Sequence, residues 1–314
     1  MTSKNKLFKS FLLILICVLC FSSVSLVSAT ELNEADTGVV DVENSTSLIN
    51  FTTTSDTEVN PTDATANNSF TALEAAGVYI RQQMVNRNAS FEVSITLPYD
   101  TYMDDGWGTN GNKYFIDEAL KHTTNANEGD YIAYSFSRYT VGRNAEYNSS
   151  TDTITLTHTY QFTYYNTAEQ EAYVTSQIPG ILKEAGVAVN MSNLEKSRRI
   201  SQWMIDNVTY SVTDADITLK YSPYGAVYNG RAVCQGYSLL AYRLLMAAGV
   251  DCRLITGTVN GGNHAWILAK MDDGMYYNMD IMYEDTFASV VSSKPFKYLY
   301  KGSKNFGDLR TMFI

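Results

Sequence analysis

The chain of 314 residues has few cysteines, histidines and basic residues, and each shortage limits what the protein can be. It holds 23 Lys and Arg against 33 Asp and Glu, which gives a formal net charge of -10. Nucleic acid is bound by clustered basic side chains, so neither DNA nor RNA is expected as a partner. The hydrophobic fraction of 45% is typical of a globular protein large enough for two domains, and it excludes a collagen-like or wholly disordered chain.

Long apolar runs are absent except at the N-terminus. Three lysines precede an apolar run over residues 11–21, and residues 27–29 supply the small-x-small pattern that signal peptidases accept. A transmembrane anchor is the alternative, but this run would span only about 16 Å as a helix, roughly half of a bilayer core. We therefore predict a signal peptide at residues 1–29 and a secreted, extracellular protein with no membrane span in the mature chain.

Basic side chains are also absent from residues 30–69, which carry eight acidic residues among many Ser, Thr and Asn. The segment has no helical or strand periodicity, so it cannot bury enough apolar surface to offset the entropy of ordering. We predict a disordered acidic tether.

Residues 70–166 are predicted to form a small α+β domain to which no role is assigned. His158 falls on the apolar face of a predicted strand and is expected to be a packed core histidine. The expected elements are helices at 73–85 and 115–122, strands at 91–97, 131–139 and 154–165, and a loop at 104–112.

Residues 167–314 have a different pattern, with predicted helices at 169–186 and 194–207 and predicted strands at 253–258, 264–270 and 275–280. Between them, apolar residues follow Cys234 at helical spacing, and Gly249 is placed as a helix stop. Cys234 is therefore expected in the first turn of an amphipathic helix. An Asp-Gly pair at 273–274 predicts a hairpin between the last two strands.

The mature chain keeps two cysteines, Cys234 and Cys252, and a disulfide between them is the default expectation for an exported protein. A helix over 234–248 would separate its ends by about 21 Å, which is far beyond the reach of a disulfide. A free thiol at Cys234 is predicted instead. The same distance argues against a zinc site built from both cysteines, so no metal or cofactor is expected.

A thiol at a helix N-terminus is favoured as a thiolate and can act as a nucleophile if a base lies nearby. His264 begins a strand after a glycine-rich loop and is the best candidate base among the three histidines. The midpoint between 264 and 280 is 272, inside the predicted turn, so His264 and Asp280 should be near neighbours. Such a pair could orient a catalytic imidazole, or it could be a simple surface ion pair.

Three ordered blocks carry a family resemblance: residues 230–238 around Cys234, His264-Ala265-Trp266, and residues 273–280 ending in Asp280. Over about residues 195–300 the chain resembles the transglutaminase-like superfamily. The resemblance implies a papain-like α+β core in which the helix bearing the cysteine packs on an antiparallel sheet. It also implies that Cys234 is the nucleophile, His264 the general base and acid, and Asp280 the residue that orients it.

The implied reaction is acyl transfer through a thioester, with the oxyanion held by the backbone N–H of Cys234 and one further donor, for which Gln235 and Tyr228 are candidates. The leading hypothesis is a cysteine peptidase that hydrolyses peptide or isopeptide bonds, with a peptide, a protein or a cell-wall polymer as substrate. One alternative is a cross-linking protein-glutamine gamma-glutamyltransferase. Another is a catalytically silent binding or adhesion module on the same fold.

Overall fold

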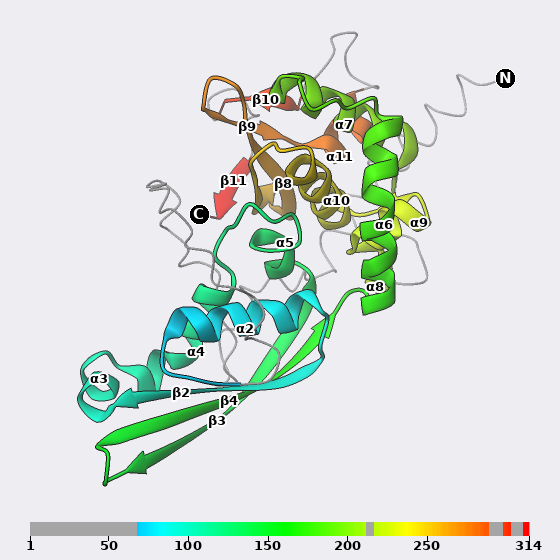
Figure 1. Ribbon diagram of the computed structural model, residues 1–314. Coiled ribbons are helices and arrows are strands. Elements are labelled where there is room, and N and C mark those ends of the chain that lie inside the picture. Colours follow the sequence, from blue (N-terminus) through cyan, green and yellow to red (C-terminus); the bar gives the residue numbers. More distant parts are fainter. Residues whose placement is uncertain (1–67, 212–216, 289–297, 303–309, 314) are drawn as a thin grey trace, which may run out of the picture. The chain divides into compact units, whose positions relative to one another are not determined.

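The computed structural model describes residues 68–211, 217–288, 298–302 and 310–313. The predicted signal peptide and nearly all of the predicted tether lie outside these residues. Contacts divide the described chain into two units, one of residues 68–123 and 127–164, the other of residues 124–126 and 165–313. We call them the N-terminal unit and the C-terminal unit and describe each by itself (Figure 1).

The N-terminal unit is a four-stranded sheet in the order β1-β2-β4-β3, with β1 parallel to β2 and the other pairs antiparallel. Figure 1 shows α2 and α4 lying along this sheet, and α2 packs against both α4 and β2. The elements are β1 (Ser69–Phe70), α2 (Leu73–Val85), β2 (Ser90–Pro98), α3 (Tyr99–Asp104), α4 (Trp107–Ala119), α5 (Asp130–Ala133), β3 (Phe136–Asn148) and β4 (Thr153–Tyr164).

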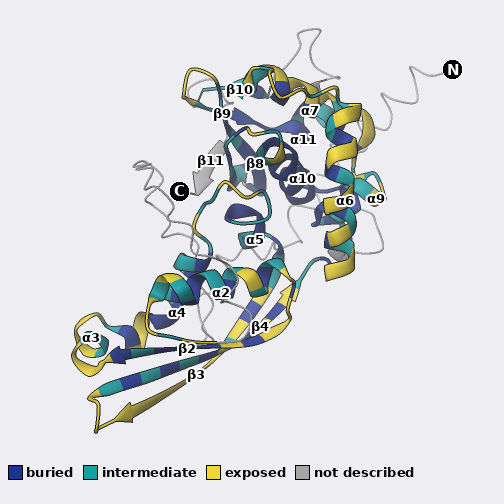
Figure 2. Cartoon of the chain, viewed as in Figure 1, coloured by how far each residue is buried: buried dark blue, intermediate teal, exposed yellow. Residues whose placement is uncertain are grey.

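Alternation in the sequence explains β2 and β4. The apolar residues of β2 are buried at every second position, from Phe91 to Leu97, while Glu92 is exposed (Figure 2). Their partners on β4 alternate in the same phase, because Phe91 pairs with Tyr160 and Leu97 with Ile154. One face of the sheet therefore supplies the apolar core of this unit.

Two expectations for this unit were wrong. The predicted loop at 104–112 contains the end of α3 and the first half of α4, which runs from Trp107 rather than from residue 115. Gly106 adopts the left-handed conformation and so separates α3 from α4. Burial of Trp107, Gly111 and Phe115 on one face outweighs the poor helix propensity of the Gly- and Asn-rich stretch.

The predicted strand at 131–139 is also displaced. Residues 130–133 form the short helix α5, and β3 begins at Phe136 and extends to Asn148. The polar outer half of β3 has little apolar patterning, and its pairing with β4 over residues 140–148 defines it as a strand. Backbone pairing of this kind leaves no signal in a hydrophobic pattern.

His158 is a packed core residue, as predicted. Its side chain is 2% exposed and its ring meets the rings of Phe115 and Tyr160 at centroid distances of 5.0 and 6.1 Å. Burial, with a contribution from the charge of Arg143, lowers the pKa of His158 to about 4.

The C-terminal unit contains an antiparallel five-stranded sheet in the order β10-β9-β8-β7-β11, and helix α10 packs on β7 and β8. A helix bearing Cys234 on an antiparallel sheet is the α+β arrangement that the sequence predicts. Its helices are α6 (Ala168–Glu184), α7 (Asn193–Asn207), α8 (Ile217–Lys220), α9 (Pro223–Tyr228), α10 (Cys234–Ala247), α11 (Ile281–Tyr283) and the π-helical η3 (Glu284–Ala288). Its strands are β5 (Thr209–Tyr210), β6 (Arg231–Ala232), β7 (Cys252–Val259), β8 (Gly262–Lys270), β9 (Tyr276–Met279), β10 (Leu299–Lys301) and β11 (Arg310–Phe313).

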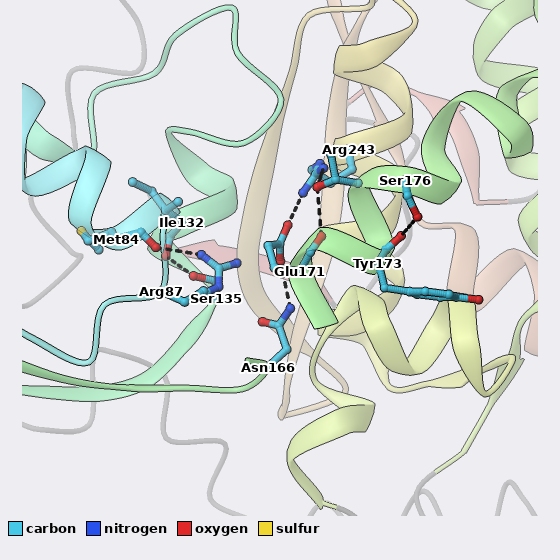
Figure 3. A network of polar contacts seen from close by, with 10 residues as sticks. Met84, Arg87, Ile132, Ser135, Asn166, Glu171, Tyr173, Ser176 and Arg243 are labelled. Atoms are coloured by element: carbon cyan, nitrogen blue, oxygen red, sulfur yellow. Dashed lines mark hydrogen bonds and ion pairs between the residues drawn. The ribbon is translucent and has the colours of Figure 1, made fainter. Parts of the chain in front are cut away.

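Helix α10 is held to α6 by buried charge. Arg243 of α10 forms an ion pair with Glu171 of α6 (Figure 3). It also donates a hydrogen bond to the hydroxyl of Thr175 at 2.9 Å. The amide of Asn166 donates to the other oxygen of Glu171 at 2.9 Å. Because both oxygens of the buried carboxylate are paired, the contact fixes α6 against the helix that begins at Cys234.

No helix in the described part of the chain is long and apolar enough to cross a membrane.

Candidate active site

Cys234 is the first residue of α10. Its carbonyl accepts a hydrogen bond from the hydroxyl of Ser238 at 2.9 Å, and the side chain is 5% exposed. The segment before the helix lies directly against this first turn, because a Cβ atom on Gly236 would stand 2.6 Å from the carbonyl oxygen of Lys220. Only glycine fits at that position, so the turn bearing the thiol is tightly packed.

Cys234 and Cys252 are buried, and no disulfide joins them in the described part of the chain. Cys252 begins β7, beyond the end of α10, and its thiol contacts the carbonyl of Tyr242 at 3.9 Å. The two thiols that the structure describes therefore lie in different settings.

Strand β8 carries His264, which pairs with Gly257 of β7. The expected flexible loop before His264 is instead a two-residue hairpin turn: Val259 pairs with Gly262, and Asn260 and Gly261 between them both have positive φ. An Asn-Gly pair between strands is the typical signal of such a turn. His264 thus sits two residues inside a strand and is 3% exposed.

Asp280 follows the last residue of β9 and is the N-cap of α11. Its Oδ1 accepts a hydrogen bond from the backbone N–H of Tyr283 at 3.1 Å, and its Oδ2 lies 2.8 Å from Nε2 of His264. The capping bond fixes the carboxylate, and the carboxylate then fixes the imidazole. The ring of Tyr283 also packs edge-on against His264, with 4.9 Å between centroids.

The predicted proximity of His264 and Asp280 is observed, although the register behind it differs. Ile267 pairs with Met279 and Lys270 with Tyr276, so the hairpin is centred on 273 rather than 272. In that register Asp280 lies beyond the end of β9, where the chain turns into α11. The side-chain contact arises because the cap directs Asp280 back toward the ring.

Burial and the neighbouring charges shift the pKa of His264 in opposite directions. Burial lowers the pKa of His264, but the Asp280 carboxylate and the Cys234 side chain outweigh that effect and raise it to about 9. Nδ1 of the ring has no hydrogen-bond partner within the described residues, while Nε2 faces Asp280. The thiol is thus close enough to influence the ring, and one ring nitrogen is uncommitted.

The two candidate oxyanion donors lie in different settings. Gln235, next to Cys234, is buried and its side chain forms a hydrogen bond with Tyr165. Tyr228 is 61% exposed at the end of α9, and its ring stacks on Tyr224 with 5.0 Å between centroids. The same ring also packs edge-on against Tyr173, with 5.6 Å between centroids.

Sequence analysis missed Tyr221 as a neighbour of the thiol. Burial raises the pKa of Tyr221, and the charge of Cys234 raises it further, so the hydroxyl lies within electrostatic range of the sulfur. The Tyr221 ring stacks on Tyr165 at 5.4 Å. Its place just before Ser222, the N-cap of α9, was the available signal, but ring stacking between distant segments has no sequence pattern.

The fold and these side chains define a class: an α+β domain in which a cysteine at a helix start lies beside a histidine of the adjacent sheet, and that histidine contacts an aspartate just after a strand of the same sheet. Residues 182–281 match the family described as the transglutaminase-like superfamily, and they include all three residues. This part of the chain is a transglutaminase-like superfamily domain.

Solved structures give distant likenesses. A crystal structure of a TGase is 12% identical, with a TM-score of 0.35; the match covers 77% of this chain and 64% of that one. A proposed cysteine protease from Cytophaga hutchinsonii is 16% identical, with a TM-score of 0.29, and the match covers 46% of this chain and 64% of that one. No curated protein matches the chain.

Proposed function

We propose that the protein is an exported cysteine-dependent acyl transferase that hydrolyses peptide or isopeptide bonds through Cys234, His264 and Asp280. The observation that carries the proposal is the 2.8 Å contact between Nε2 of His264 and Asp280, which leaves Nδ1 uncommitted beside the thiol. An imidazole fixed at one nitrogen and free at the other can accept the proton of a neighbouring thiol.

In the proposed reaction, Nδ1 of His264 takes the thiol proton and the sulfur of Cys234 attacks the amide carbonyl. The tetrahedral intermediate collapses when His264 returns that proton to the leaving amine, so the C–N bond breaks and a thioester remains. Water then attacks the thioester with His264 as base, which releases the acid and restores the thiol. Asp280 stabilises the imidazolium in both steps without being protonated.

The backbone N–H of Cys234, at the first position of α10, is the proposed principal oxyanion donor. The substrate is proposed to be a peptide or protein, with cell-wall peptides as the first to test because the N-terminal sequence predicts export. Residues 70–166 are proposed as a separate domain from residues 167–314, which carry the reaction.

Alkylation tests the proposal, with Cys252 as an internal control. The protein is treated with iodoacetamide at pH 7 and both cysteines are followed by peptide mass spectrometry. Cys234 should be modified much faster than Cys252, and His264→Ala should slow only Cys234. Slow labelling of Cys234 that is unchanged by His264→Ala would contradict the proposal and favour a silent binding module.

Products separate hydrolysis from cross-linking. The protein is incubated with cell-wall peptides and with dimethylcasein, each with and without a fluorescent primary amine, and Cys234→Ala is the control. The proposal expects new amino termini and little incorporation of the amine. Efficient incorporation without cleavage would instead identify a cross-linking enzyme.

A further inference from the structure

The hydroxyl group of Tyr237 has one hydrogen to donate but lies within hydrogen-bond distance of two acceptors. Its Oη lies 2.8 Å from the backbone carbonyl of Val208, at the end of α7, and 2.8 Å from Oδ2 of Asp285, in η3. Both contacts have hydrogen-bond length, and the Tyr237 side chain is 1% exposed. A phenol donates only one hydrogen bond, so it can satisfy only one of these acceptors at a time.

A proton on Asp285 would supply the second donor that these two contacts require. A protonated Asp285 donates to Oη of Tyr237, and Tyr237 then donates to the carbonyl of Val208. If Asp285 is ionised, it takes the single Tyr237 hydrogen for itself, and the carbonyl of Val208 loses this donor. Loss of such a bond at a buried site is costly.

The charges around Asp285 support the protonated form. Burial raises the pKa of Asp285 to about 6; the hydrogen bond from Tyr237 on α10 acts against the rise, and Asp206 on α7 adds to it. Burial raises the pKa of Tyr237, and the charges of Asp285 and of Tyr210 on β5 raise it further. On the same segment, the Glu284 carboxylate turns to the backbone N–H of Tyr298 at 2.6 Å.

These two residues join the elements of the candidate site. Tyr237 lies three residues after Cys234 on α10, and Asp285 lies five residues after Asp280. We propose that Tyr237 and Asp285 are a positioning pair that shares a proton and holds the thiol-bearing helix against the segment that carries Asp280. While Asp285 is protonated, Tyr237 is bonded both to Asp285 and to the carbonyl of Val208; when Asp285 ionises, the bond to Asp285 persists and the bond to Val208, at the end of α7, is lost. The pair's effect on the reactivity of Cys234 rests on the proposed function, whereas its effect on stability does not.

Asp285→Asn is the decisive variant, because an amide N–H can donate to Tyr237 at every pH. Melting temperature is measured from pH 4.5 to pH 7.5 for the natural protein and the variant. The natural protein should lose melting temperature relative to Asp285→Asn as the pH rises through about 6, because its carboxyl favours the folded state only when protonated. Asp206→Asn, which removes a like charge but keeps the pair, should move this loss to lower pH. Parallel curves for the natural protein and Asp285→Asn would overturn the shared proton.

Alkylation of Cys234 over the same pH range tests the positioning role. The rate for the natural protein relative to Asp285→Asn should fall by about threefold or more between pH 5 and pH 7.5, the scale of coupling between neighbouring groups. Tyr237→Phe should abolish the difference. A constant rate ratio alongside a clear difference in melting temperature would remove the positioning role. Slow labelling of Cys234 at every pH, with that melting difference present, would instead contradict the proposed function and leave the shared proton standing.

Discussion

At the scale of single residues, the two nitrogens of His264 have different surroundings. Nε2 meets a carboxylate whose other oxygen is already held by the N-cap bond of α11, and Nδ1 is uncommitted. Asp280 orients the ring through Nε2, and the rings of Trp266 and Tyr283 pack against it at centroid distances of 5.7 and 4.9 Å. Because the ring is buried, the opposite charge at 2.8 Å is poorly screened, and it outweighs the cost of burying a cation.

We expect NMR titration of ¹³C-labelled histidine to show His264 with a pKa of about 9 in the natural protein. Asp280→Asn should lower that pKa below the ordinary value of 6.5, because burial then acts without the carboxylate. Cys234→Ala should lower it by less. His158 should titrate at about 4 in every variant and serves as the control. A pKa for His264 near 6.5 that Asp280→Asn does not move would contradict the geometry.

Much of this neighbourhood could be predicted from the sequence. The apolar spacing after Cys234 places the thiol in the first turn of α10, and the Asp-Gly pair brings His264 close to Asp280. The hairpin centre lies one residue later than predicted, which shifts the strand pairing by two residues; this could not be foreseen, because it depends on where β9 ends and α11 begins. Tyr221 could not be found either, since its neighbours Tyr165 and Cys234 are distant in sequence and meet only by packing.

At the scale of elements, two glycines in helices make a matched pair. Gly236 stands in the first turn of α10, where an added Cβ would meet the carbonyl oxygens of Lys220 and Ser222 at 2.6 and 3.0 Å. Gly180 lies in α6 with nothing within 4 Å of its would-be Cβ. The same substitution should therefore have opposite effects at the two positions.

We expect Gly236→Ala to destabilise the protein by about 1–3 kcal/mol, because rigid backbone atoms must move to admit the methyl group. Gly180→Ala should instead stabilise it by about 0.5–1 kcal/mol through the better helix propensity of alanine. Denaturant unfolding of both variants measures the difference. Equal effects of the two substitutions would show that the segment before α9 does not press on α10.

Elements with strong periodicity were predicted best. Helix α2 has the predicted bounds, whereas α4 was missed over its first two turns because its buried face uses Gly111 and Asn112 beside aromatic residues. A side chain at position 111 would crowd the ring of His158 on β4, because an added Cβ would stand 3.4 Å from it. This contact joins distant segments and cannot be read from the sequence. The Asn260-Gly261 pair is a sequence signal for the turn between β7 and β8. It was missed because only these two residues separate the strands, and the expected strands ended short of them.

At the scale of the whole molecule, three groups that titrate between about pH 4 and pH 9 have pKa shifts of opposite sign in the two units. In the C-terminal unit, the folded pKa values of His264 and Asp285 are raised to about 9 and about 6. Each favours the folded state when protonated, so their stability is lost as the pH rises through those values. In the N-terminal unit, the pKa of His158 is lowered to about 4, so stability is present above pH 6.5 and is lost as the pH falls toward 4.

Raising the pH from 4.5 to 8.5 should therefore stabilise the N-terminal unit and destabilise the C-terminal unit. The change for His158 alone is about 3 kcal/mol, since a pKa shift of one unit corresponds to about 1.4 kcal/mol. Scanning calorimetry should show two transitions whose midpoints move in opposite directions. His158→Phe, which keeps a packed ring between Phe115 and Tyr160, should flatten the pH response of the first transition, and Asp285→Asn should reduce that of the second. A single transition, or two that move together in the natural protein, would show that the units do not respond to these groups separately.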